Sequence, residues 1–235
     1  MERMDDQHRD LVKTARVTGV WYLLLAVAGI LGFMIFHPQV YVLNDPAKTL
    51  ANLSDHESLA RIRLVLELTI VFTQALTAVW FCRLFKNIKE WAAWAIGIWG
   101  MVNSVVIMIS AISMATSLGI AGNSVLSLEH KIILIELLQQ LITNAWGVGG
   151  LFFGLWLIPM GYIVVSSHRM PVWLGRILII SGFGYILTTY LNYMGFNNPG
   201  IQVLVIPATV GEFWMIGYLL IYGIRKSNVH IEHLD

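Results

Sequence analysis

One carboxylate stands near the middle of an apolar stretch that is long enough to cross a lipid bilayer. Glu212 lies within residues 203–221, where every other residue is uncharged. About 20 helical residues, each rising roughly 1.5 Å, cross the hydrocarbon core of a bilayer. A charge at that depth costs several kcal/mol, so we expect the Glu212 carboxyl to be protonated, paired or facing a wet cavity. Glu212 is therefore the first candidate functional residue.

Polar residues recur on one face of several other apolar stretches, at spacings of three, four and seven residues. Arg63, Glu67 and Gln74 share a face in this way, and Asn103 shares one with Ser110. Such spacing places side chains on one side of an α-helix. Because lipid offers their hydrogen-bonding groups no partner, we expect these faces to turn into a helix bundle. The residues predicted to line a ligand site are Glu212, Glu67, Arg63, Asn103, Tyr185, Asn144 and Asn192.

Structural roles account for some of the same residues. Serine, threonine and asparagine on buried faces often only join helices to one another. Arg63 and Glu67, four residues apart, also fit a structural ion pair, although the arginine comes first, which is the weaker order on a helix. Glu212 differs, because no lysine or arginine lies at its depth to pair with it. A structural role and a binding role thus both stay open for Arg63 and Glu67.

Histidine and acidic residues occur together before the second apolar stretch. His56, Glu57 and Arg61 are expected at the mouth of the polar face, while His37, His56 and His130 are weak candidates for a metal site. Their spacing matches no recognised ligand pattern, so the sequence predicts no metal. The seven histidines lie in the expected loops and tails, which argues against a haem held between spans. We expect no cofactor.

The composition identifies the class of protein. Of the 235 residues, 57% are hydrophobic and 12% are charged, and the mean hydropathy is +0.70. Soluble globular chains contain roughly 45–50% apolar and 25% charged residues, so this chain is predicted to lie in a bilayer. A net charge of +1 without a basic run gives no basis for binding nucleic acid. The single cysteine, Cys82, excludes an intrachain disulfide.

Six apolar stretches predict an all-α, polytopic bundle of six transmembrane helices over residues 17–224. Residues 1–16 form a polar N-terminal segment, and residues 225–235 form a polar tail. Residues 37–60 are expected to be a polar loop that ends in a helix start capped by Ser54. The predicted spans are residues 17–36, 62–81, 94–117, 141–165, 172–193 and 202–224.

The distribution of lysine and arginine predicts the orientation in the membrane. With both termini in the cytoplasm, eleven of the 15 Lys and Arg residues lie inside and four lie outside, in agreement with the positive-inside rule. In this orientation the polar faces describe a funnel that opens to the outer side and ends near Glu212. Such a funnel is suited to a lipid or another small amphipathic molecule, and the bilayer itself is the other expected partner.

Several short stretches together resemble one known family. They occur in the first span, before the second, in the fourth and fifth spans, and in the last. In order, they are residues 15–23 (ARVTGVWYL), 56–61 (HESLAR), 152–154 (FFG), 182–185 (GFGY) and 207–212 (PATVGE). They resemble a bacterial family of six-span integral membrane proteins, domain of unknown function 4386.

This resemblance carries an expected location but no activity. It implies a multi-pass protein of the bacterial inner membrane, and it marks Glu57, Arg61 and Glu212 as family positions. The chain departs from the family pattern at Ala60, where an aromatic residue is favoured. Because the family has no activity to transfer, function must be argued from the residues themselves.

Three kinds of function fit the sequence. We expect first a protein that binds or transports a small amphipathic molecule or lipid through the polar funnel. The alternative is an intramembrane enzyme, a hydrolase or a lipid-modifying enzyme, in which Glu67 and Glu212 supply acid–base chemistry, with or without a metal on the outer side. The third is a structural or sensory membrane component, in which the polar faces only hold helices together.

Overall fold

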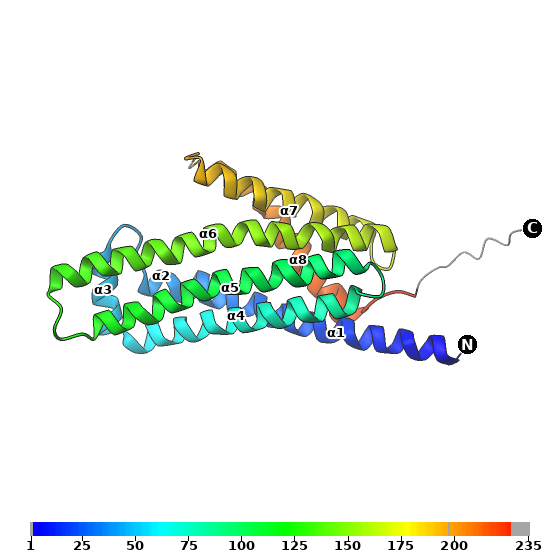
Figure 1. Ribbon diagram of the computed structural model, residues 1–235, viewed down its shortest axis with the longest axis horizontal. Helices are drawn as coiled ribbons and strands as arrows, with labels where there is room; N and C mark the ends of the chain where they lie inside the picture. Colours follow the sequence, from blue (N-terminus) through cyan, green and yellow to red (C-terminus); the bar gives the residue numbers. More distant parts are fainter. Residues whose placement is uncertain (1, 197, 227–235) are drawn as a thin grey trace, which may run out of the picture. The chain divides into compact units, whose positions relative to one another are not determined.

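The computed structural model describes residues 2–196 and 198–226, so residues 227–235 of the predicted tail lie outside the described residues. Every regular element in the described part is helical (Figure 1). In chain order they are α1 (Glu2–Ile30), η1 (Leu31–Phe36), α2 (His37–Val40), α3 (Pro46–Asp55), α4 (Glu57–Phe85), α5 (Glu90–Ala121), α6 (Leu128–Ser167), α7 (Val172–Tyr193), η2 (Pro199–Val205) and α8 (Ile206–Ile221).

Within residues 2–196 and 198–226, six helical segments are long and apolar enough to cross a membrane, which confirms the predicted all-α fold with six spans. Each exceeds the roughly 20 residues that a bilayer requires. The segments are Asp6–Val40, Glu57–Phe85, Glu90–Ala121, Leu128–Ser167, Val172–Tyr193 and Gly200–Ile221.

The expected polar loop at residues 37–60 is wrong in part, because this stretch contains the short helices α2 and α3. Asp45 caps α3 by accepting a hydrogen bond from the Lys48 backbone N–H at 2.9 Å, and Pro46 takes the first helical position. Ser54, predicted to cap the next helix, instead lies in the last turn of α3, and its hydroxyl donates to the Leu50 carbonyl at 3.1 Å. The Asn-Asp-Pro turn signal is therefore a helix start.

The chain divides into two compact units, and each is described by itself. Unit 1 comprises residues 1–20, 79–98 and 154–235, and unit 2 comprises residues 21–78 and 99–153. Unit 1 thus contains α7 and α8, and unit 2 contains η1, α2 and α3. Each of α1, α4, α5 and α6 contributes one part to either unit.

In unit 1, glycines let α6 and α7 approach closely. A Cβ atom added to Gly154 would lie 2.5 Å from the Gly182 carbonyl oxygen, and one added to Gly182 would lie 2.7 Å from the Gly154 carbonyl. Gly161 and Gly175, one heptad further along, face each other in the same way. Small residues at this spacing are a common means of packing helices in membranes.

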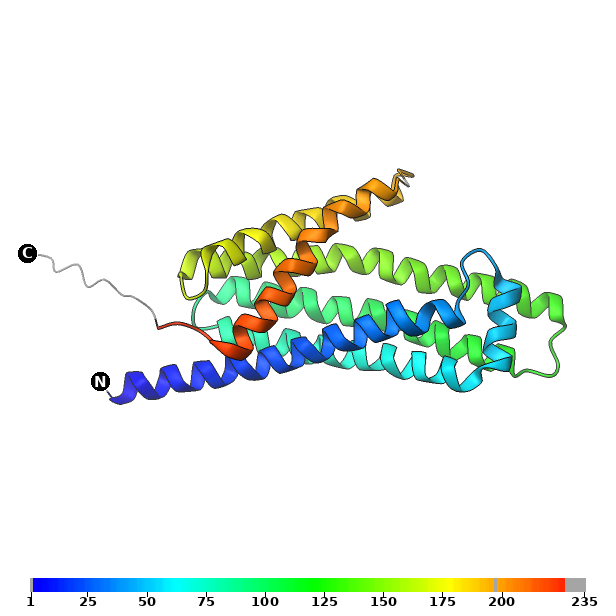
Figure 2. The ribbon, with the colours of Figure 1, turned by 180° about the vertical axis from the view of Figure 1, so that it is seen from behind.

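In unit 2, residues 57–78 of α4 and residues 99–121 of α5 run antiparallel and are joined by polar contacts. The Ser104 hydroxyl donates to the Val71 carbonyl at 2.7 Å. Gly100 packs against Ala78, where an added Cβ would lie 2.6 Å from the Ala78 Cβ. α3 lies across the ends of these helices and of α6 (Figures 1 and 2). The buried cluster at this end is Val40, Tyr41, Leu50, Leu53, Ala60, Met114, Ala121, Ile135 and Ile142.

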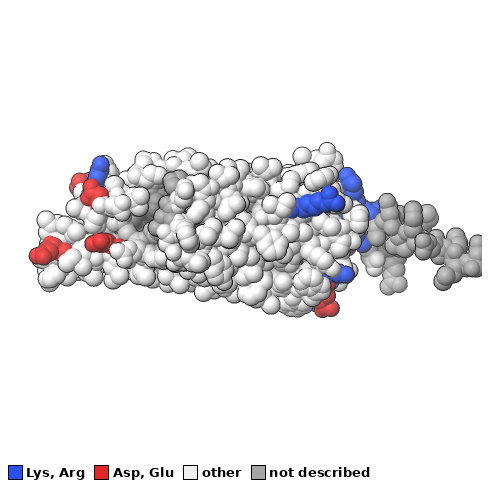
Figure 3. Space-filling model, turned by 90° about the horizontal axis from the view of Figure 1, so that it is seen from above, with Lys and Arg blue, Asp and Glu red and all other residues white. Residues whose placement is uncertain are grey.

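The two faces of α4 and α5 in unit 2 reverse the arrangement of a water-soluble protein. Their polar residues Arg63, Glu67, Gln74, Asn103 and Ser110 are fully buried. Their outer faces are apolar, as expected for surfaces in contact with lipid tails. Figure 3 shows the charged side chains of unit 2 gathered at the end that carries α3. The exposed large apolar residues are Ile62, Val65, Leu68, Phe72, Met101, Val105, Met108, Ile109 and Ile112.

Candidate functional site

A buried ion pair on α4 forms the centre of the candidate site. Arg63 and Glu67 are both fully buried, and the Arg63 Nη1–H donates to Glu67 Oε2 at 2.9 Å. The other carboxylate oxygen, Oε1, accepts a hydrogen bond from the Trp146 indole N–H on α6 at 2.8 Å. One helical turn separates Arg63 from Glu67, so α4 alone holds the pair together. Each carboxylate oxygen of Glu67 thus accepts one hydrogen bond.

The guanidinium of Arg63 keeps two donor groups that have no partner among the described residues. Its Nε and Nη2 atoms are buried without a hydrogen-bond acceptor. The group lies over the Phe33 ring, with Cζ at 4.9 Å from the ring centroid. Gly32 lets the guanidinium pack closely against the helix backbone, since an added Cβ would lie only 3.3 Å from Nη1. Two donors of one rigid guanidinium are therefore available to an oxygen-bearing group.

A π-helix in the first span places the residues that surround Arg63. η1 carries both Gly32 and Phe33, and π-helical turns frequently occur at functional sites. From Phe33 the rings of His37 and Tyr41 continue in a ladder, with stacked centroids 5.6 Å and 4.9 Å apart. Trp146 meets the Phe33 ring edge-on at 4.2 Å. We call Phe33, His37 and Tyr41 the aromatic ladder.

A groove opens beside the aromatic ladder, between the segment that follows η1 and α6. One pocket of about 350 Å³ is lined by His37, Pro38, Tyr41, Val42, Leu43, Gln139, Ile142 and Thr143. A neighbouring pocket of about 340 Å³ is lined by Leu43, Asn44, Pro46, Glu136, Gln139, Gln140, Thr143 and Asn144. The two pockets share lining residues and form one groove, and each has the size of a small-molecule site.

Three hydrogen bonds hold the wall of this groove in place, and the wall contains a neutral phenol. The Gln139 amide donates to the Val42 carbonyl and to the Thr49 hydroxyl oxygen, both at 3.1 Å. Thr49 also accepts from the Val42 backbone N–H at 2.9 Å. Burial raises the pKa of Tyr41 above its ordinary value, more than the nearby Ser117 and Arg63 lower it, so its hydroxyl stays protonated. The wall of the groove around Tyr41 is therefore ordered and neutral, and Glu136 is an acidic residue elsewhere in the lining.

Further polar groups without partners among the described residues are buried in unit 2, at the level of the ion pair and further along α4. Asn103 lacks a partner at both amide atoms, as do Gln74 at Oε1 and Ser110 at Oγ, among the described residues. The Ser104–Val71 hydrogen bond sets the register of α4 and α5, and it brings Ser110 to the level between Arg63 and Glu67. Ser110 is therefore a buried hydroxyl at the level of the ion pair.

The predicted site residues fall into both units. Arg63, Glu67 and Asn103 are buried inside unit 2, and Asn144 is exposed on the groove, where its amide donates to the Gln140 carbonyl at 2.9 Å. The others lie in unit 1. Glu212 on α8 and Tyr185 on α7 are close enough to interact electrostatically, and Asn192 stands near the end of α7.

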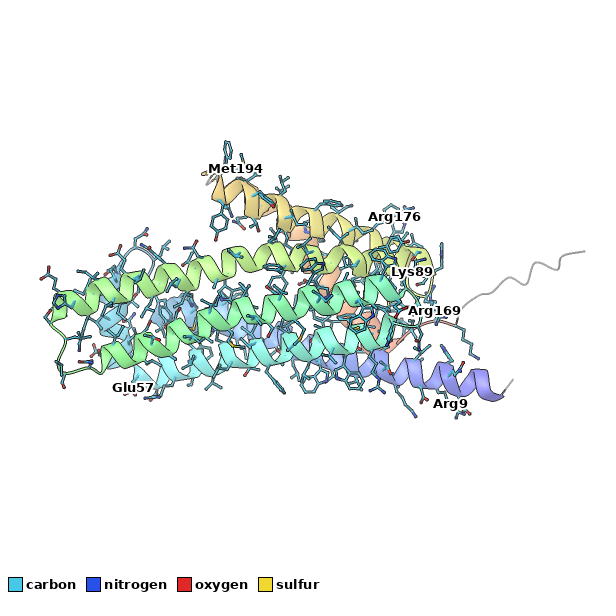
Figure 4. All side chains as sticks on the ribbon, viewed as in Figure 1. Arg9, Glu57, Lys89, Arg169, Arg176 and Met194 are labelled. Carbon is cyan, nitrogen blue, oxygen red and sulfur yellow. The ribbon has the colours of Figure 1, made fainter. Side chains whose placement is uncertain are left out.

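The three histidines that were weak metal candidates lie in different elements, and the residues predicted at the mouth are on the surface. His56 is exposed between α3 and α4, and Arg61 donates from Nε to Glu57 at 2.8 Å on the surface of α4 (Figure 4). His37 belongs to the aromatic ladder, and the exposed His130 shares a hydrogen bond with Ser127 at 2.9 Å. No group of three or more His, Cys, Asp or Glu side chains in the described part is arranged to hold a metal.

Sequence reasoning missed Trp146, Phe33 and Gln139. A tryptophan inside an apolar span needs an acceptor for its N–H, so the position of Trp146 could have indicated a buried polar partner. Phe33 carried none, because its position depends on a π-helical turn that no residue pattern announces. Gln139 lies just before the predicted span at residues 141–165, and its partners on the segment after η1 are distant in sequence.

The family model described as Domain of unknown function (DUF4386) matches residues 17–223. The chain belongs to this family. One relative of this DUF4386 member is an uncharacterized protein of Archaeoglobus fulgidus, which is 39% identical over 69 residues, or 29% of this chain. The match covers 43% of that protein, so the chain spans less than half the length of this curated relative. No solved structure matches the chain.

Proposed function

We propose that this DUF4386 protein binds a small amphipathic molecule inside unit 2. Its polar end would meet the free donors of Arg63, and its apolar body would lie along the aromatic ladder and the adjoining groove. The observation that carries this proposal is the fully buried guanidinium of Arg63, in which Nε and Nη2 have no acceptor among the described residues.

Energetics favour a binding role over a purely structural one. Removing a guanidinium from water costs several kcal/mol, and an ion pair recovers this only when the remaining donors are also satisfied. Glu67 satisfies a single nitrogen of Arg63. A ligand with one or two acceptor oxygens would satisfy the others.

We further propose that the protein lies in the cytoplasmic membrane of a bacterium with both termini inside. The uneven distribution of Lys and Arg supports this orientation, in which the groove faces the outer side. A carboxyl at Glu212 beside Tyr185 in unit 1 supports a second polar position at mid-membrane depth. Transport of the bound molecule, in addition to binding, rests on this second position.

The catalytic alternative gains no support at Glu67. Both of its oxygens already accept hydrogen bonds from protein groups, Arg63 and Trp146, so neither oxygen is directed at a substrate. A base of this kind also needs a nucleophile or a water within reach. Binding is therefore the function that this geometry supports best.

Native mass spectrometry of the protein in mild detergent, followed by organic extraction, tests the proposal. We expect a stoichiometric lipid or small organic molecule on the wild type, and its loss in Arg63→Lys and in Thr143→Trp, which fills the groove. Arg176→Lys is the matched control, because this exposed arginine also lies over an aromatic ring, that of Trp173 (Figure 4). Equal occupancy in wild type and all three variants, or a ligand-free wild type, would refute binding at this site.

A further inference from the structure

The charges around Arg63 determine which polar end the site accepts. Arg63 and Glu67 are the only lysine, arginine, aspartate or glutamate residues fully buried in the described part of unit 2, and together they are neutral. The other titratable groups that face them are His37 and Tyr41 at the end of the first span. α6 presents the Trp146 indole to Glu67, and Ser110 of α5 is buried at the level of the pair; neither group titrates near neutral pH.

The two free nitrogens of Arg63 match a flat group with two acceptor oxygens. Nε–H and one N–H of Nη2 point in parallel from the same edge of a guanidinium, and this fork pairs with both oxygens of a carboxylate. The guanidinium also lies over the Phe33 ring, so the space around it is bounded by planar groups. A planar carboxylate places both of its oxygens in the plane of this fork, whereas a phosphate monoester carries more negative charge than one arginine balances.

We infer that the ligand is an alkyl carboxylate bound through the Nε and Nη2 donors of Arg63, and that Glu67 takes up one proton when it binds. This inference rests on the proposed function and specifies the class of molecule. Two carboxylates that share one buried guanidinium leave an excess negative charge, as in other pairs of closely placed acids. One proton entering with the anion keeps the buried site neutral.

Glu67 is the group in the site that is suited to receive this proton. Tyr41 already holds its own proton, because burial raises the pKa of its hydroxyl. Protonated Glu67 keeps one oxygen to accept the Trp146 N–H, and its new O–H becomes a donor toward the incoming carboxylate. No covalent bond changes, so the balance is one anion and one proton in, with a net charge of zero before and after.

Calorimetric titration of the full-length protein in lipid nanodiscs with three eight-carbon probes tests this inference. The probes are octanoate, 1-octanol and octylammonium, and each titration is repeated in two buffers of different ionisation enthalpy to count protons. We expect octanoate to bind at least tenfold more tightly than the other two, with about one proton taken up per octanoate. Between pH 6.5 and 8.5, where octanoate stays ionised, its affinity should fall about tenfold per pH unit.

Variants separate the roles of the two residues. Arg63→Lys, which removes the fork, should weaken octanoate binding tenfold or more. Glu67→Gln resembles the protonated acid, so it should bind octanoate at least as tightly as the wild type, with no proton uptake and no pH dependence. Arg176→Lys should behave as the wild type. Circular dichroism and size exclusion show whether each variant is folded, and the proton count on the wild type needs no variant.

The outcomes distinguish the inference from the function that it rests on. If none of the three probes binds and native mass spectrometry finds no ligand, the proposed function itself fails. If 1-octanol or octylammonium binds as tightly as octanoate, binding stands and the carboxylate inference is overturned. If octanoate is preferred but no proton enters with it, the role of Glu67 is overturned.

Discussion

A buried residue pair defines what unit 2 is able to do. Arg63 and Glu67 follow each other by one helical turn, and the pair Glu57 and Arg61 has the same spacing on the same helix. The first pair is fully buried, and the second is mostly exposed. Because burial removes water as a competing partner, the same chemistry has different consequences at the two places. This difference gives a direct test of the ion pair.

Glu67→Ala should destabilise the protein by about 3–5 kcal/mol, because it leaves the Arg63 charge buried and the Trp146 indole without an acceptor. Glu57→Ala, at the exposed pair, should cost below about 1 kcal/mol. Unfolding by sodium dodecyl sulfate, followed by circular dichroism, measures both. Equal losses in the two variants would contradict the burial of Arg63 with Glu67.

The sequence supports prediction of this pair only in part. Charged and amide residues inside apolar stretches are few, so their types and their spacing along a helix selected Arg63, Glu67 and Asn103. The inward turn of these side chains follows from the absence of partners in lipid. Their connections do not, because the Trp146 and Phe33 contacts join residues far apart in the chain, and only packing decides them.

Elements that interrupt regular helices shape the site. η1 adds a residue to a helical turn, which shifts the side chains that follow by about 100° around the helix axis. η1 also contains Phe33, whose ring lies against the Arg63 guanidinium. Neither η1 nor α3 was predictable, since residues 44–46 fit a turn as well as a capped helix start, and the buried Leu50 and Leu53 decide between them.

Contact between α6 and α7 depends on glycines, and this dependence is testable. Gly154→Ala would place a Cβ 2.5 Å from the backbone carbonyl of Gly182, which cannot move without separating the helices. We expect a loss of about 1–3 kcal/mol in stability, as for other overpacked contacts. Gly217→Ala on α8 has no atom within 4 Å of the added Cβ and should be neutral or slightly stabilising.

The same detergent unfolding assay compares the two glycine variants. If the α6–α7 contact relies on glycine, the unfolding midpoint of Gly154→Ala is lower than that of the wild type. The midpoint of Gly217→Ala is then unchanged or higher. Matching midpoints would mean that the helices pack at a larger separation than the structure has.

At the scale of the whole molecule, composition and hydropathy determine the class of fold. Hydrophobic residues make up 57% of the chain, and its described part contains six helical segments long enough to cross a membrane. The outward faces of α4 and α5 are apolar, and their polar residues are buried. This arrangement is stable only where lipid replaces water. Orientation is a separate matter, because it depends on where the Lys and Arg residues lie in the short loops.

Cysteine labelling in intact cells tests the orientation. With Cys82 replaced by serine, a cysteine at Ser124, in the loop between α5 and α6, should react with a membrane-impermeant maleimide added outside. A cysteine at Asn87, between α4 and α5, should react only after permeabilisation, because the loop that contains it also carries Lys86 and Lys89. Both substituted residues are exposed, so access depends on the side of the membrane alone. The reverse pattern would place the groove on the cytoplasmic side, and a protein of that orientation would take its ligand from inside the cell.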